Sequence, residues 1–274
     1  MATKPDFRVS YVDFDKDWDD LFCTYWESWK DPVQVTGVLT FAWLSEGGVL
    51  EKRSYESAKK DYLDLAISSP DMHWIKVEDR SLIGPGVNCI VAGGAWTQHR
   101  KNPFREHHQP TASDQEGIYN LKLPGLGYPV GSERHRLMCE FYAQMLSWRP
   151  KMMARPHAHG QALWALPKYR RLGAAQLALD FFLQTTDDLG LETFLEGSSI
   201  GTPLYLRSGY VPIVKPVMVF TPPNQNKKPS EDWRHIVRSL HAETISIMWR
   251  PPGGVYTEGE TIFPWEGKPR SIKL

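Results

Sequence analysis

Apolar side chains in the first part of the chain follow strand spacing and then helix spacing. Phe7–Phe14 alternates apolar and polar residues, which predicts a half-buried strand. In Asp17–Trp29 the aromatic and aliphatic residues recur every three or four positions, which is typical of an amphipathic helix. After an apolar, mobile-looking connection that follows Pro32, the same spacing predicts a second helix over Leu50–Ile67.

A strand hairpin and a long polar segment are predicted next. Met72–Glu78 and Asn88–Gln98 have strand patterns on either side of a turn rich in Gly and Pro. Lys101–Val130 is polar and without periodicity, so we expect a surface insertion, a kind of segment that often covers a substrate site. Helical spacing returns over Ser132–Trp148, with Ser132 as the predicted N-cap.

The second half alternates short strands with helices. The predicted strands are His159–Leu166, Leu191–Gly197, Tyr210–Thr221 and Thr244–Trp249, and the predicted helices are Gly173–Leu189, Thr202–Ser208 and Glu231–His241. Asn224–Ser230 reads as a charged surface loop. This order favours one α/β domain over residues 1–274, with an insertion at about 101–130 and a carboxy-terminal extension from about 222.

Composition narrows the class of partner. The 32 basic and 32 acidic residues leave no net charge, which argues against nucleic acid and acidic membranes as partners. No apolar run reaches the roughly 18–20 residues of a membrane span, and Met1–Asp15 lacks the apolar core of a signal peptide. The three separated cysteines, Cys23, Cys89 and Cys139, indicate neither a disulfide framework nor a zinc site. We therefore expect a soluble, cytoplasmic protein whose eleven tryptophans form an aromatic core rather than a substrate cavity.

One turn between a predicted strand and a predicted helix has the chemistry of an anion site. Pro167 ends the strand, and the chain turns through Tyr169–Arg171 before the helix that starts at Gly173. The first N–H groups of a helix lack partners within it and carry positive partial charge, to which the two arginines add full charges. The small residues Gly173–Ala175 let a phosphate approach, or else only let the helix pack tightly. A diphosphate is the ligand that this arrangement favours.

The stretch Ala162–Phe182, ALWALPKYRRLGAAQLALDFF, resembles the coenzyme A signature of GNAT acetyltransferases. That signature is Arg or Gln, two residues, Gly, one residue, then Gly or Ala, and it falls here on Arg170, Gly173 and Ala175. Leu191–Ile213 is similar to the family's fifth strand, short helix and sixth strand, including the Leu-Tyr and Gly-Tyr pairs.

The resemblance, which covers about residues 157–213, implies a GNAT acyltransferase fold: a mostly antiparallel mixed sheet, splayed between strands four and five and flanked by helices. It also implies direct acetyl transfer from acetyl-coenzyme A to an amine in a ternary complex, without a metal. Free amides near Leu163 and Ala165 would hold the pantetheine arm and polarise the thioester carbonyl. The implied cofactor-binding residues are Leu163, Trp164, Ala165, Leu166, Arg170, Arg171, Leu172, Gly173, Ala174 and Ala175.

The resemblance also gives candidates for proton transfer. Tyr205 lies where family members often place a general acid, although it could instead be a half-buried packing residue. His159 resembles a histidine position of arylalkylamine-type members and is a candidate base, with His157 one alternation away on the same face. The two histidines could bind a metal, but no third ligand is evident, and we expect at least one of them at the surface. Glu196 is another candidate base, acting through water, or else a solvated carboxylate.

The acceptor is expected to be a small amine, aromatic or hydrophobic, selected by the aromatic first helices and the insertion. Peptide or protein acceptors remain open. Two other readings also remain open: a catalytically silent coenzyme A binding domain, and a GNAT-fold enzyme with another acyl donor or another reaction. The sequence indicates no oligomeric state.

Overall fold

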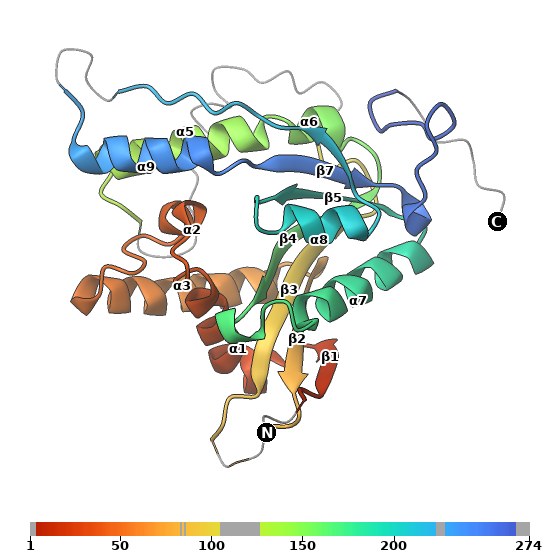
Figure 1. Ribbon diagram of the computed structural model, residues 1–274, viewed down its shortest axis with the longest axis horizontal. Coiled ribbons are helices and arrows are strands. Elements are labelled where there is room, and N and C mark those ends of the chain that lie inside the picture. Colours follow the sequence, from red (N-terminus) through yellow and green to blue (C-terminus); the bar gives the residue numbers. More distant parts are fainter. Residues whose placement is uncertain (1–3, 83, 85, 105–126, 223–227, 267–274) are drawn as a thin grey trace. The chain divides into compact units, whose positions relative to one another are not determined.

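The sheet agrees with the class of fold that the sequence indicates. A computed structural model describes residues 4–82, 84, 86–104, 127–222 and 228–266. Its seven strands follow the order β1-β2-β3-β4-β5-β7-β6, with helices alongside the strands (Figure 1). The pairs β1–β2, β2–β3, β5–β7 and β6–β7 are antiparallel, which confirms the predicted mostly antiparallel sheet. Within these described ranges no helix is long and apolar enough to cross a bilayer.

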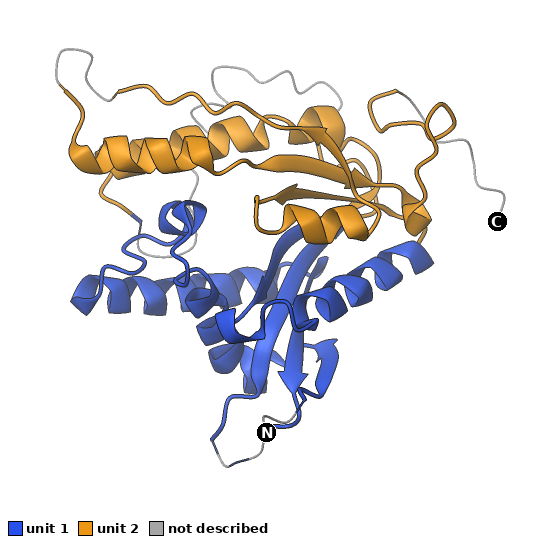
Figure 2. Cartoon of the chain, viewed as in Figure 1, with its two compact units in different colours: residues 1–98, 124–127, 159–188 blue, residues 99–123, 128–158, 189–274 orange. Residues whose placement is uncertain are grey.

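The chain divides into two compact units, coloured separately in Figure 2. The first comprises residues 1–98, 124–127 and 159–188, and the second comprises residues 99–123, 128–158 and 189–274. The assignment of the whole chain to one domain, and the splay between the fourth and fifth strands, stay predictions. Most of the predicted insertion, residues 105–126, and most of the charged loop, residues 223–227, lie outside the described residues.

The first unit holds the amino-terminal elements together with most of β4 and α7. Except for the terminal residues of β3 and β4, its elements are β1 (Phe7–Tyr11), α1 (Phe14–Ser28), α2 (Val35–Thr40), α3 (Gly48–Ser68), β2 (Met72–Asp79), β3 (Ile90–His99), β4 (His157–Ala165) and α7 (Ala174–Asp188). The helix α1 begins three residues earlier than predicted, because the Asp13 side chain caps it by accepting from the Asp15 N–H.

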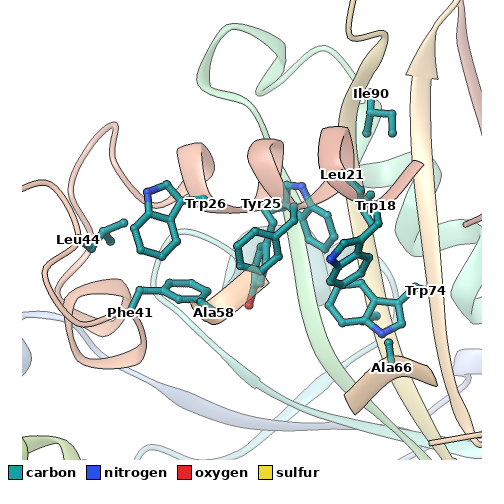
Figure 3. Close-up of a cluster of buried hydrophobic side chains, with 13 residues drawn as sticks. Trp18, Leu21, Tyr25, Trp26, Phe41, Leu44, Ala58, Ala66, Trp74 and Ile90 are labelled. Atoms are coloured by element: carbon teal, nitrogen blue, oxygen red, sulfur yellow. The ribbon is translucent and has the colours of Figure 1, made fainter. Parts of the chain in front are cut away.

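The tryptophans of α1 form part of an aromatic core, as their number suggested. Trp18 and Trp26 are 4% and 2% exposed, so they are packing residues and do not line an open entrance. Trp18 meets Trp74 edge to face at 5.2 Å between ring centroids, and Trp26 lies 5.0 Å from Phe41 (Figure 3). Trp164 joins the same cluster from β4, 4.6 Å from Tyr25.

The connection after Pro32 contains a helix, α2, that the sequence did not indicate. Its β-branched residues and Gly37 are poor helix formers, and six residues are too few for a helical periodicity, so neither signal indicated a helix. Packing supplies the missing stability, since Leu39 is fully buried and Gly37 lies so close to Trp29 that an added Cβ would be 2.7 Å from its ring. Tertiary contacts outweigh intrinsic propensity here.

The second unit contains the remaining strands and helices. Its elements are α5 (Glu133–Leu146), α6 (Arg149–Met152), β5 (Glu192–Gly197), α8 (Thr202–Arg207), β6 (Val211–Val214), α9 (Glu231–Ala242) and β7 (Ser246–Arg250). Ser132 caps α5 as predicted, by accepting from the His135 N–H. The short helix α6 was missed, because one turn that begins with Arg-Pro has no periodicity to detect. The core of this unit contains Met153, Phe194, Ile247 and Trp249.

The predicted strand Tyr210–Thr221 was wrong beyond Val214. Residues 215–222 keep strand-like alternation, with Met218 and Phe220 buried and Val217 and Val219 exposed. Their backbone, however, is bonded by side chains of helices: Gln144 bonds both the N–H and the carbonyl of Val219. A two-residue alternation of apolar residues indicates that one face of the segment is buried. It does not indicate whether the backbone is hydrogen-bonded by a neighbouring strand or by side chains of a helix.

Candidate active site

The predicted anion site is a short turn of unusual backbone in the first unit. After β4 the chain makes one turn of 3-10 helix, Pro167–Tyr169. Arg171 then has φ of +62° and Gly173 has φ of +102°, and α7 begins at the next residue. Positive φ strains residues that carry a Cβ, so Gly173 is needed for its conformation; nothing lies within 4 Å of where its Cβ would be.

The start of α7 presents backbone donors next to exposed residues. The Leu177 N–H bonds the Gly173 carbonyl, so the amides that precede Leu177 in the first turn have no acceptor within the helix. Arg171 and Gly173 are exposed, and the first turn contains no acidic residue. Ala174 is fully buried, so for this alanine tight packing is the reason for its small size. The turn has the electrostatics expected of a phosphate site.

Tyr169 ties this turn to the end of β2. Its hydroxyl donates to the Asp79 carboxylate, which also accepts from the Asp6 N–H at 3.0 Å and from the Ser81 hydroxyl at 2.7 Å. Burial alone would raise the pKa of Asp79, but these hydrogen bonds outweigh it and hold the pKa below its ordinary value. Sequence reasoning missed Asp79, because nothing in the local pattern links it to a turn ninety residues away.

Arg170 is bonded to backbone carbonyls. Its Nη2 donates to the Ser28 carbonyl at 2.7 Å, its Nη1 to the Asp31 carbonyl, and its Nε to the Ala165 carbonyl at 3.4 Å. Arg171, in contrast, has no side-chain hydrogen bond or ion pair with any residue that the structure describes. The Arg170 guanidinium is therefore hydrogen-bonded to backbone carbonyls, whereas the Arg171 guanidinium has no such partner among the described residues.

The predicted pantetheine-binding segment lies at the end of β4. The Leu166 N–H donates to the Val91 carbonyl of β3 at 2.9 Å, so this amide is already used. Because N–H groups alternate sides along a strand, those of Leu163 and Ala165 point away from β3, as a role in thioester binding requires. The Trp164 side chain is in the aromatic core, where its Nε1 donates to Thr24 at 3.2 Å, so it is turned away from any ligand.

Both candidate histidines are buried, so the expectation that one would lie at the surface was wrong. His157 and His159 are 1% and 2% exposed. The His157 ring lies 4.9 Å from the His99 ring and 5.2 Å from the Phe194 ring, contacts that a strand pattern alone does not show. Its Nδ1 lies 2.7 Å from the Arg155 carbonyl, which can only accept, so Nδ1 carries the proton. Among the described residues no cluster of metal-ligating side chains is present.

Glu196, on β5, is held in an ion pair. Arg149 of α6 donates to both carboxylate oxygens, at 2.7 and 3.1 Å, and the Glu196 side chain is only 8% exposed. The alternative of a solvated carboxylate is therefore wrong. Arg149 could not be anticipated, because α6 itself gave no sequence signal.

Tyr205 lies in α8, half-buried against two glycines of the second unit. A Cβ on Gly201 would be 2.9 Å from the Tyr205 ring, and one on Gly197 would be 3.2 Å from it. Burial raises the pKa of Tyr205 to about 12. The phenol therefore stays protonated at neutral pH, which is the state a general acid requires.

A separate cavity of about 370 Å³ lies in the second unit, next to a buried ion pair. Its lining includes Arg155, Glu192 and Trp249, and the Trp249 Nε1 donates to the Glu192 carboxylate at 3.0 Å. Of the predicted site residues that the structure describes, none lines this cavity. We assign it no role.

Comparisons with known proteins define the fold. A scan against protein-family models and a search of curated proteins found no match. Among solved structures, arylalkylamine N-acetyltransferase 2 from Aedes aegypti is 10% identical with a TM-score of 0.53, and covers 90% of this chain and 99% of its own. A mosquito arylalkylamine N-acetyltransferase like 5b is 10% identical with a TM-score of 0.54, covering 90% and 100%. An agmatine N-acetyltransferase is 14% identical with a TM-score of 0.50, covering 90% and 99%.

These matches cover nearly the whole of each solved chain, whereas the identities are too low to carry over a substrate. The chain therefore has the GNAT acetyltransferase fold, as the turn after β4 and the order of its elements had indicated. The proteins it is similar to act, by their names, on amines.

Proposed function

We propose that the protein transfers an acetyl group from acetyl-coenzyme A to the amine of a small acceptor. The observation that carries this proposal is the turn that enters α7, with positive φ at Arg171 and Gly173 and no acidic residue in the first helical turn. Together with the GNAT fold, such a turn favours a diphosphate next to the strand that would hold the pantetheine arm.

The proposed reaction is direct. A base removes a proton from the acceptor ammonium and the amine nitrogen attacks the thioester carbon, forming the C–N bond. The C–S bond then breaks, and the nitrogen loses a second proton, which replaces the one that the acid gives up. The N–H groups of Leu163 and Ala165 stabilise the negative charge that develops on the carbonyl oxygen. Tyr205 gives its proton to the departing thiolate, and its phenol is protonated at neutral pH, as that role requires.

For the base, we propose His159 rather than Glu196. Arg149 occupies both oxygens of Glu196 and stabilises the charged carboxylate, so proton uptake there would break an ion pair. A histidine changes charge near neutral pH and is suited to the task. Replacing His159 with Gln should lower kcat about a hundredfold and remove the acidic limb of the pH–rate profile. A His159→Gln variant that keeps the wild-type profile would assign the base elsewhere.

The proposed acceptor is a small amine, aromatic or hydrophobic. The supporting observations are the named activities of the similar structures and the absence of net charge on this chain. The buried tryptophans of α1 do not contribute to this argument, because they are part of the core.

Mass spectrometry with acetyl-coenzyme A and a panel of arylalkylamines, agmatine, polyamines and peptides tests the proposal. We expect an acetylated product from at least one small amine, and about a hundredfold less of it when Tyr205→Phe replaces the wild type over the same period. Binding of coenzyme A without any product would favour the silent binding domain. Product only with a longer acyl-coenzyme A would identify another donor, and no binding of coenzyme A at all would reject the assigned turn.

A further inference from the structure

The two arginines of the turn are adjacent in sequence but have different surroundings. The Arg170 guanidinium meets carbonyls of three separate residues, each through a different nitrogen. Arg171 is exposed and bonds to no side chain or carbonyl among the described residues.

The three carbonyls that Arg170 bonds indicate a structural role for this residue. Ser28 is the last residue of α1, and the final carbonyls of a helix lack partners within it and carry negative partial charge. Asp31 belongs to the connection that follows, and Ala165 ends β4. Arg170 thus joins the end of α1 to the turn before α7, and its charge is already matched by carbonyl oxygens.

A second contact holds the same turn from the neighbouring residue. The Tyr169 hydroxyl donates to Asp79 at the end of β2, and the Tyr169 ring meets Phe7 edge to face at 6.1 Å. The two residues before Arg171 are therefore fixed to α1 and to β2. This anchoring accounts for how Arg171 can be held at positive φ, which is unfavourable for a residue with a side chain.

We propose that Arg170 is a positioning residue that fixes the turn to the end of α1, and that Arg171 supplies the charge that meets the diphosphate. The assignment of Arg171 rests on the proposed function, whereas the assignment of Arg170 does not. The Arg171 side chain bonds to no described residue and precedes the first turn of α7, which has no acidic residue, whereas the exposed Lys168 of the same turn lies over the Tyr169 ring.

The test compares Arg170→Gln, Arg170→Lys and Arg171→Gln by thermal unfolding without ligand. Arg170→Gln should lower Tm by about 3 °C or more, because it removes charge and several hydrogen bonds. Arg170→Lys should fall between it and the wild type, since a lysine keeps the charge but not the planar fork. Arg171→Gln should change Tm by less than about 1 °C. Equal losses of Tm at the two positions would overturn the division of roles.

Calorimetry with coenzyme A and with pantetheine, which lacks the diphosphate, supplies the second readout. Arg171→Gln should weaken the binding of coenzyme A about tenfold at low salt and make its Kd less dependent on salt concentration. The affinity for pantetheine should not change. Arg170→Gln, measured well below its Tm, should weaken the binding of coenzyme A but keep the wild-type salt dependence of Kd, because no ionic contact between the protein and the diphosphate is lost. The reverse pattern would reject the proposal.

The outcomes separate this inference from the proposed function. If the wild-type protein binds no coenzyme A, the proposed function fails, and the Tm comparison still decides whether Arg170 anchors the turn. If Arg170→Gln does not fold, Arg170→Lys carries the test: a wild-type Tm in Arg170→Lys would show that the three carbonyl contacts are unimportant.

Discussion

At the scale of single residues, the candidate site depends on positions whose environment is unusual. Gly173 adopts a φ that other residues avoid, and Tyr205 packs on glycines that leave room for its ring. The sequence indicated both residues through a resemblance to known proteins. It could not indicate why they are required, because φ and ring contacts depend on segments that are distant in the chain.

A negative charge at position 173 should weaken the binding of coenzyme A. We expect Gly173→Glu to bind coenzyme A at least tenfold more weakly than Gly173→Gln, because the carboxylate repels the diphosphate. Gly173→Gln is the matched control, since both side chains impose the same strain at φ of +102°. Calorimetry measures the difference; equal affinities would place the diphosphate elsewhere.

The Tyr205 hydroxyl should matter for turnover and for alkaline stability. Tyr205→Phe should lower kcat about a hundredfold with coenzyme A affinity nearly unchanged, because only proton donation is lost. The raised pKa means that the folded protein keeps this proton at a pH where the unfolded chain loses it. Its stabilising effect is therefore complete below about pH 10, and is lost as the pH rises towards about 12.

Denaturant titrations across that interval should then show a shallower loss of stability in Tyr205→Phe than in the wild type. Identical slopes would contradict the effect of burial on this phenol, and an unchanged kcat would contradict its proposed role as general acid.

At the scale of elements, periodicity predicted most helices and strands to within a few residues, and its failures share a cause. The helices α2 and α6 are too short to carry a periodic signal, and the segment after β6 has strand alternation without strand partners. Helix caps are easier to predict, because a serine before a helix bonds to an N–H group only three residues away. Ser132 was anticipated as a cap, and Ser230 has the same role at α9.

Ser230 should stabilise two helices at once. Its hydroxyl accepts from the Trp233 N–H at 3.0 Å to cap α9, and donates to Glu133 at the start of α5. Ser230→Ala should cost about 1–2 kcal/mol, or roughly 2–6 °C in Tm. The control Ser239→Ala, which loses only a bond to the His235 carbonyl within α9, should cost less than about 0.5 kcal/mol. Thermal unfolding compares them, and equal costs would argue against the cap.

At the scale of the whole molecule, the carboxy-terminal residues take part in a core. Phe263 lies 5.2 Å from Trp249, which is 1% exposed, and 5.4 Å from Tyr256. Most of the described Gly- and Pro-rich tail, residues 251–266, has no regular secondary structure. It nevertheless covers part of the core of the second unit.

Phe263→Ala should therefore destabilise the protein by roughly 2–4 kcal/mol, because it exposes apolar surface on Trp249. The control is Trp265→Ala, which removes a larger ring that is 42% exposed and stacks on Phe263 at 4.6 Å. We expect it to cost less than half as much. Urea unfolding gives both values, and a greater loss at Trp265 would contradict the packing.

The sequence by itself determined the order of elements, the aromatic core, and the turn whose glycine and small residues favour a phosphate. These features are encoded locally, in spacing, caps and residue size. Only the tertiary structure decided that the two histidines are buried, that Arg149 forms an ion pair with Glu196, and that Arg170 donates to the Ser28 carbonyl at the end of α1. Those contacts join residues about 40 to 140 positions apart, and no local pattern records which distant group will meet a given side chain.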